Sequence, residues 1–188
     1  MRFGLLARLV LVLIAIPATN AWADEYQDTI KVFTNAGESG SFFGKSHGYA
    51  VFPTIGKGGI GVGGAYGKGR VYVGGKHVGD TSMGQLTIGF QLGGQAYSQI
   101  IFFEDKRAFE EFSSGKFEFG AQASAVAITA GASAAATTAG SSAGASGGKN
   151  DATTVGKYSG GMAVFTVAKG GLMYEASIGG QKFGYTAK

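Results

Sequence analysis

The sequence predicts an α+β, β-rich fold. We expect a single domain of curved, mostly antiparallel sheet, sandwich- or barrel-like, with two short helices. Glycine accounts for 35 of 188 residues and recurs inside alternating apolar runs. Glycine within a strand marks a bulge, a sharp bend or a close approach of two backbones. The chain has no cysteine for disulfides, and the absence of a strand–helix–strand rhythm argues against a parallel sheet.

The first 23 residues have the pattern of a secretory signal peptide. An apolar run at 9–16 follows two arginines, and the small residues Ala21 and Ala23 match a signal-peptidase site. This run is shorter than the roughly 20 residues that span a bilayer. We therefore expect cleavage after Ala23, a mature domain over 24–188, and a periplasmic or secreted protein peripheral to a membrane. A retained membrane anchor is the alternative.

Charge is unevenly distributed along the chain. The sequence has 16 basic and 12 acidic residues, and without the two arginines of the signal the net charge is +2 (14 − 12). This balance is too weak to indicate nucleic-acid binding. A stretch between Gly40 and Gly79 has no acid and carries several cations: Lys45, Lys57, Lys68, Arg70 and Lys76. One region of the surface should therefore be basic.

The first predicted element is a helix over 24–37. Tyr26, Ile30 and Phe33 share one face at spacings of four and three. We expect this helix to cover one end of the β-core, contact with a membrane being the alternative.

The strands that follow are punctuated by glycine. Strands are expected at 47–53 and 60–66, a turn at Gly67-Lys68-Gly69, extended chain at 70–73 and a turn at Gly74-Gly75.

The longest alternating stretch is 85–103. Its pattern places Leu86 and Ile88 on a buried face, and Gln85 on a wetter face or inside a cavity. A second helix is predicted over 104–114, with an acidic cap at its start and Gly115 at its end.

The last third of the chain changes composition. A strand is expected within 121–129, followed at 130–150 by a flexible loop of alanine, serine, threonine and glycine, with an alanine-rich helix as the alternative. Strands at 162–167 and 172–178 should form a hairpin.

No motif in the chain indicates catalysis. Gly59-x-Gly61-x-x-Gly64 has dinucleotide-binding spacing, but strand-like sequence follows where that motif needs a helix. Gly44-Lys45-Ser46 resembles the end of a phosphate-binding loop, but Gly40 lies one residue too close. His47 and His77 lack the neighbours of a metal site. We therefore expect no enzymatic activity, cofactor or metal ion.

Four segments together resemble the SYLF domain, a lipid-binding family with exported bacterial members. They are GYAVFP (48–53), GKGGIGVGGAYGKG (56–69), GFQLGGQAYSQIIFF (89–103) and KGGLMYEASIGGQKFGY (169–185). The resemblance implies a single β-rich domain that binds phospholipid headgroups. It also implies that cations in the matching glycine-rich motif, Lys57, Lys68 and Arg70, are the candidates for that contact.

The sequence thus predicts a non-enzymatic domain that attaches reversibly to anionic phospholipid at a membrane surface. Lys57, Lys68 and Arg70, with Lys45 and Lys76, would meet the headgroups, each contributing on the order of 1 kcal/mol. Phe42 and Phe43 would add an apolar contact. The alternative is a structural or protein-partner module of the bacterial cell envelope.

Overall fold

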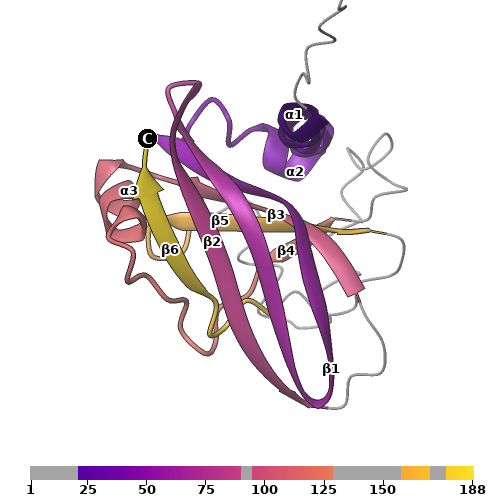
Figure 1. Cartoon of the computed structure of the whole chain (residues 1–188). Helices are drawn as coiled ribbons and strands as arrows, with labels where there is room; N and C mark the ends of the chain where they lie inside the picture. The colour runs from indigo at the N-terminus through magenta and orange to yellow at the C-terminus, as the bar shows by residue number, and fades with distance from the viewer. Residues whose placement is uncertain (1–20, 90–94, 129–157, 170–176) are drawn as a thin grey trace, which may run out of the picture.

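The computed structural model describes residues 21–89, 95–128, 158–169 and 177–188 (Figure 1). The helices are α1 (Ala21–Asn35), α2 (Gly37–Gly40) and α3 (Lys106–Ser113). The strands are β1 (Gly48–Val73), β2 (Lys76–Gly89), β3 (Gln95–Phe103), β4 (Val126–Ile128), β5 (Met162–Lys169) and β6 (Lys182–Ala187). The predictions for 1–20 and 130–150, and most of the second strand predicted at 172–178, lie outside the described residues.

The strands form one open, twisted sheet in the order β4-β5-β3-β1-β2-β6. All its pairings are antiparallel except that between β4 and β5. Because of the twist, β5 runs across the view of Figure 1 while β2 and β6 run along it. The predicted β-rich α+β domain and its mostly antiparallel sheet are confirmed.

β1 doubles back on itself. Its first half, 48–57, pairs with β3, and its second half, 61–73, pairs with β2. Gly59, with a φ of 141°, lies at the reversal, which forms the lower tip of the sheet in Figure 1. The turn predicted at 67–69 is wrong, since the strand continues through these residues.

Each face of the sheet carries its own core. The α3-side core includes Phe52, Ile101, Phe103, Phe112 and Phe183. The α1-side core includes Phe33, Phe42, Tyr72, Phe102 and Phe165. The first half of β1, most of β3 and most of β5 therefore bury side chains on both faces, as is typical of strands that are covered on both sides.

The helix predicted over 24–37 is confirmed as α1, shifted by a few residues. Tyr26 and Phe33 are buried and Ile30 packs beside them, all in the α1-side core. Side-chain hydrogen bonds also hold α1 to the sheet. The hydroxyl of Thr54 on β1 donates to Glu25 Oε1 over 2.9 Å and accepts from Lys169 Nζ over 2.7 Å. Among the described residues, no helix is long and apolar enough to cross a membrane.

The second predicted helix is confirmed as α3. The carboxylate of Asp105 caps its start by accepting a hydrogen bond from the Ala108 amide over 2.9 Å. Gly115 follows the helix with a φ of 75°, a conformation that favours glycine at a helix end.

The prediction for 85–103 was partly wrong. The stretch contains two strands, and β2 buries the opposite face from the one expected. The amide Nε2 of Gln85 is buried and donates to the Gly179 carbonyl over 2.9 Å, whereas Leu86 is 83% exposed. The alternation was correctly read, but the buried face depends on which distant segment covers it.

A polar cluster is buried in the α3-side half of the domain. The side-chain amides of Gln99 and Gln181 exchange two hydrogen bonds, of 2.9 and 3.1 Å, and Gln181 Nε2 also donates to the Tyr97 hydroxyl over 3.2 Å. Burial raises the pKa of Tyr97 to about 12, although the hydrogen bond from Gln181 lowers it in part.

This raised pKa predicts a loss of stability at high pH. The phenol of Tyr97 ionises near 10 in the unfolded chain and near 12 in the fold, so its contribution is complete below pH 10 and declines as the pH rises towards 12. The full loss is about 3 kcal/mol. Denaturant unfolding between pH 9 and 12 should show a shallower decline for Tyr97→Phe than for the wild type. Parallel declines in the two proteins would contradict this prediction.

Candidate functional site

An exposed apolar stripe lies on the α1 face of the sheet, towards the tip of the β1 reversal. Its members are Val62, Tyr66 and Leu86, with exposed fractions of 68%, 57% and 83%. Val62 and Tyr66 alternate along β1, and Leu86 lies opposite Gly64 between them. The three side chains therefore lie on one face, and no described helix or strand covers them. We call them the apolar stripe.

Two lysines flank this stripe on the same face. Lys68 is two residues beyond Tyr66 on β1, and Lys182 of β6 lies opposite Gly84, which in turn lies opposite Tyr66. Both lysines are exposed. Sequence reasoning missed Lys182 because its neighbours on the sheet come from strands distant in the chain.

Beside the stripe is a groove of about 750 Å³ between α1, β1, β2 and β6. Gly115, which follows α3, also lines it, and its polar lining residues are Tyr26, Lys68, Arg70, Asp80, Thr81, Ser82, Tyr185 and Thr186. In the strand register, Arg70 lies opposite Asp80, and Lys68 lies opposite Ser82. The groove therefore holds two cations on one strand and a carboxylate on the next.

The ring of Tyr26 fixes one of these cations. Arg70 Cζ is 4.2 Å from the centroid of that ring, within the range of a cation–π contact. Burial raises the pKa of Tyr26; Arg70 opposes this rise, and the carboxylates of Asp80 and Glu25 add to it. Its phenol thus remains neutral at physiological pH.

The five predicted cations do not form one patch. Lys68 and Arg70 lie together in the groove. Lys57 lies on the opposite, α3 face. It is two residues beyond the buried Ile55, after the bulge in β1, and so shares the face of Ile55. Lys45 and Lys76 are exposed in the segments next to the first and last residues of β1, far from its reversal.

The two predicted aromatic contacts are part of the core. Phe42 is 4% exposed and packs against Phe102 and Phe165, with ring centroids 5.4 and 5.2 Å away. Phe43 is half-buried against Tyr49 and Phe102. Neither ring offers the free apolar surface expected of it, whereas the three members of the apolar stripe are the most exposed large hydrophobic side chains among the described residues.

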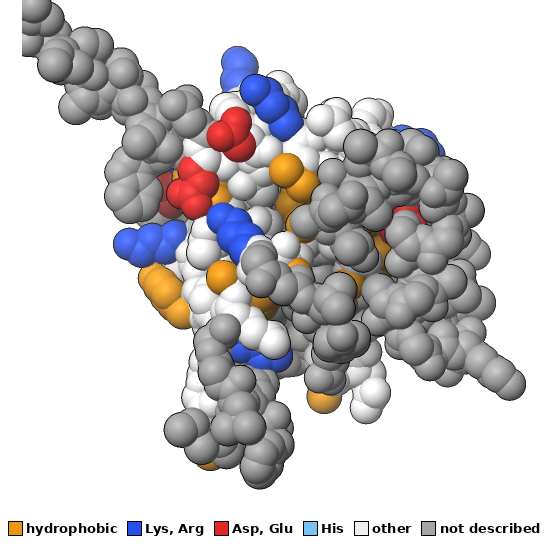
Figure 2. Space-filling view, turned by 90° about the vertical axis from the view of Figure 1, so that its right-hand side faces the viewer, with side chains coloured by type: hydrophobic (Ala, Val, Ile, Leu, Met, Phe, Trp, Pro, Cys, Tyr) orange, Lys and Arg blue, Asp and Glu red, His pale blue; other side chains and the backbone are white. Residues whose placement is uncertain are grey.

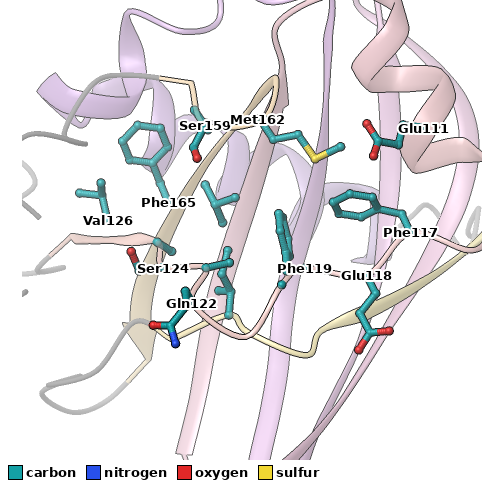
Figure 3. Close-up of a pocket in the computed structure, with 17 residues that line it drawn as sticks. Glu111, Phe117, Glu118, Phe119, Gln122, Ser124, Val126, Ser159, Met162 and Phe165 are labelled. Atoms are coloured by element: carbon teal, nitrogen blue, oxygen red, sulfur yellow. The ribbon is translucent and has the colours of Figure 1, made fainter. Parts of the chain in front are cut away.

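A separate cavity of about 370 Å³ lies between residues 117–126 and β5 (Figure 3). Its walls include Phe119, Met162 and Val164, whereas Glu111 and Glu118 carry the charges of its lining. No lysine or arginine is present among its described lining residues, so nothing there neutralises an anionic headgroup. Within the described ranges, no group of three histidine, aspartate or glutamate side chains could hold a metal ion.

Charged side chains of both signs lie on the face shown in Figure 2. Acidic side chains lie near basic ones in the upper left part of its coloured area. On this face the coloured charges are mixed, which favours recognition by local groups over attraction by a broad positive field.

Comparison with known proteins identifies the family. A family model described as Ysc84, Las17-binding protein actin regulator, matches residues 84–184, more than half of the chain. The match runs from β2 into β6. "Beta cell expansion factor A" of Aeromonas veronii is 32% identical over 92 residues, which make up 49% of this chain and 28% of that protein. The matched part is thus less than a third of that relative. The chain belongs to the Ysc84 family, which confirms the resemblance to SYLF domains.

Proposed function

We propose that this protein is a non-enzymatic module that attaches reversibly to anionic phospholipid surfaces. The apolar stripe would enter the interfacial region of the membrane while Lys68 and Lys182 meet the headgroups. The observation that carries this proposal is the exposure of Val62, Tyr66 and Leu86 on one sheet face, next to two lysines. Membership of the Ysc84 family supports a domain related to lipid binding or to actin regulation.

The energies of these groups fit weak, reversible attachment. Full burial of a leucine or valine side chain contributes about 1.5–3 kcal/mol, and a lysine near an anionic surface contributes about 1 kcal/mol. Part of this gain is offset by the freedom lost on association. The stripe and its two lysines thus suffice for reversible binding but not for permanent anchoring. Export, which the pattern of residues 1–23 predicts, would bring this surface to a membrane of the cell envelope.

Removal of the stripe should abolish most vesicle binding. In co-sedimentation with phosphatidylcholine vesicles that contain phosphatidylglycerol, V62S/L86S should bind at least tenfold more weakly, since about 1.4 kcal/mol corresponds to tenfold. K68Q/K182Q should bind more weakly at low salt and show a flatter salt dependence. Val32→Ser is the matched control, because Val32 is exposed on α1, outside the stripe.

Two results would contradict the proposal. One is wild-type affinity in V62S/L86S, and the other is equal binding of the wild type to neutral and anionic vesicles. The family description names a protein partner, which keeps open the alternative of a protein-partner module. If no vesicle binds and V62S/L86S loses a defined envelope protein that the wild type captures, the alternative replaces the proposal.

A further inference from the structure

The groove beside the stripe presents charges of opposite sign at adjacent positions. Asp80 lies opposite Arg70 and next to Thr186 in the strand register. Its side chain is 67% exposed, and within the described part of the chain only its Oδ1 has a partner, His77 Nε2 at 2.8 Å. Oδ2 of this carboxylate is therefore available to a hydrogen-bond donor from outside the protein.

Hydrogen-bond donors line the part of the groove next to Asp80, where Lys68 of β1 lies opposite Ser82 of β2. Lys68 Nζ has no hydrogen bond or ion pair within the described part of the chain, and the hydroxyl of Ser82 on the facing strand has none either. Gly184 faces Ser82 from β6, and a Cβ at Gly184 would lie only 3.0 Å from Ser82 Oγ. Glycine at this position thus keeps the hydroxyl accessible. An ammonium and a hydroxyl on facing strands suit the oxygens of a phosphate.

Arg70 lies directly opposite Asp80 and two residues from Lys68 on β1, and it is held in place. Its guanidinium lies over the Tyr26 ring, 4.2 Å from Cζ to the centroid. This contact orients the cation before any ligand arrives, which lowers the entropic cost of binding. Arg70 can thus contribute to the phosphate region without closing onto Asp80, with which it makes no ion pair within 4.0 Å.

We propose that this groove recognises a zwitterionic head group, a phosphodiester joined by a short spacer to a primary ammonium. Lys68, Ser82 and Arg70 would bind the phosphodiester, and Asp80 would accept from the ammonium. Ser82 and Asp80 are two residues apart on β2, about 6.6 Å along the strand. A polyanionic head group would be repelled by Asp80, and a trimethylated ammonium has no N–H to donate to it. This inference rests on the proposed lipid binding and adds the class of head group.

Vesicles that differ only in their neutral lipid test the preference for a head group with a primary ammonium. With a constant fraction of phosphatidylglycerol, replacement of phosphatidylcholine by phosphatidylethanolamine should strengthen binding about fivefold. Asp80→Asn should lose this gain and keep the dependence on phosphatidylglycerol. His77→Gln is the matched control, because it changes the neighbour of Asp80 but keeps a hydrogen-bond donor there and keeps the carboxylate.

A soluble probe separates recognition by the groove from effects of membrane packing. Titration with glycerophosphoethanolamine should shift the backbone amide resonances of Lys68, Asp80 and Ser82, with weaker effects from glycerophosphocholine and from inorganic phosphate. Equal responses to the three probes would overturn the inference and leave the proposed membrane attachment intact. Loss of vesicle binding with a retained response to glycerophosphoethanolamine would instead refute membrane attachment and support the groove.

Discussion

Replacement of Gly69 by alanine should destabilise the domain by roughly 3 kcal/mol, at the upper end of the cost of overpacking. Gly69 lies in β1, directly against the other half of the same strand. A Cβ there would lie 2.7 Å from the Val51 carbonyl oxygen and 2.7 Å from Cδ1 of the Phe52 ring. Backbone and a fully buried ring leave little room for adjustment, so the two halves of β1 would have to separate.

Thermal and denaturant unfolding measure this effect. The melting temperature of Gly69→Ala should fall by about 10 °C, given roughly 2–4 °C per kcal/mol for a chain of this size. The matched control is Gly56→Ala in the same strand, where nothing lies within 4 Å of the added Cβ. That variant should be unchanged or slightly more stable, because alanine reduces the entropy of the unfolded chain. Equal stability of the two variants would refute the role assigned to Gly69.

Gly69 also illustrates what the sequence could predict about the sheet. The frequency of glycine correctly indicated close approach of backbones, but Gly67 and Gly69 were assigned to a turn. Turns and tight strand contacts both select glycine, and only the partner segment distinguishes them. Here that partner is 51–55, which the reversal at Gly59 brings alongside.

Elements that depend on local signals were predicted well. The apolar face of α1 follows from the spacing of Tyr26 and Phe33, and the start of α3 follows from the cap at Asp105. The buried face of β2 could not be predicted in this way. Whether Gln85 or Leu86 is covered depends on a segment near Gly179, more than 90 residues away.

In the candidate site too, features set by local sequence could be predicted and those set by distant segments could not. Lys68 and Arg70 are two residues apart in one strand, so their common face follows from alternation alone. Lys57 lies on the other face because a bulge between Phe52 and Ile55 shifts the register. The apolar stripe was missed because exposed and buried apolar residues look alike in a sequence.

Replacement of Gln181 by leucine should be the other strongly destabilising change, at about 3 kcal/mol. Gln99 and Gln181 are both fully buried and bond to each other through both ends of their amides. Leucine at 181 would leave the Gln99 amide without its partner, and an unsatisfied buried polar group costs about 1–3 kcal/mol. It would also remove the hydrogen bond to the Tyr97 hydroxyl. Because these hydrogen bonds are lost together, we expect the destabilisation to be near the upper limit of that range.

The double variant Q99L/Q181L distinguishes an unsatisfied amide from a simple loss of packing. Removal of both amides leaves no unpaired amide in the core, so the double variant should be destabilised by less than the sum of the single variants. We expect a coupling of about 1–2 kcal/mol in a double-mutant cycle measured by urea unfolding. Strict additivity would show that the two amides stabilise the domain independently. The coupling would mean that this polar pair specifies how 177–181 docks on β3. That same segment accepts the hydrogen bond of the buried Gln85, so that the neighbouring Leu86 lies on the exposed face of β2.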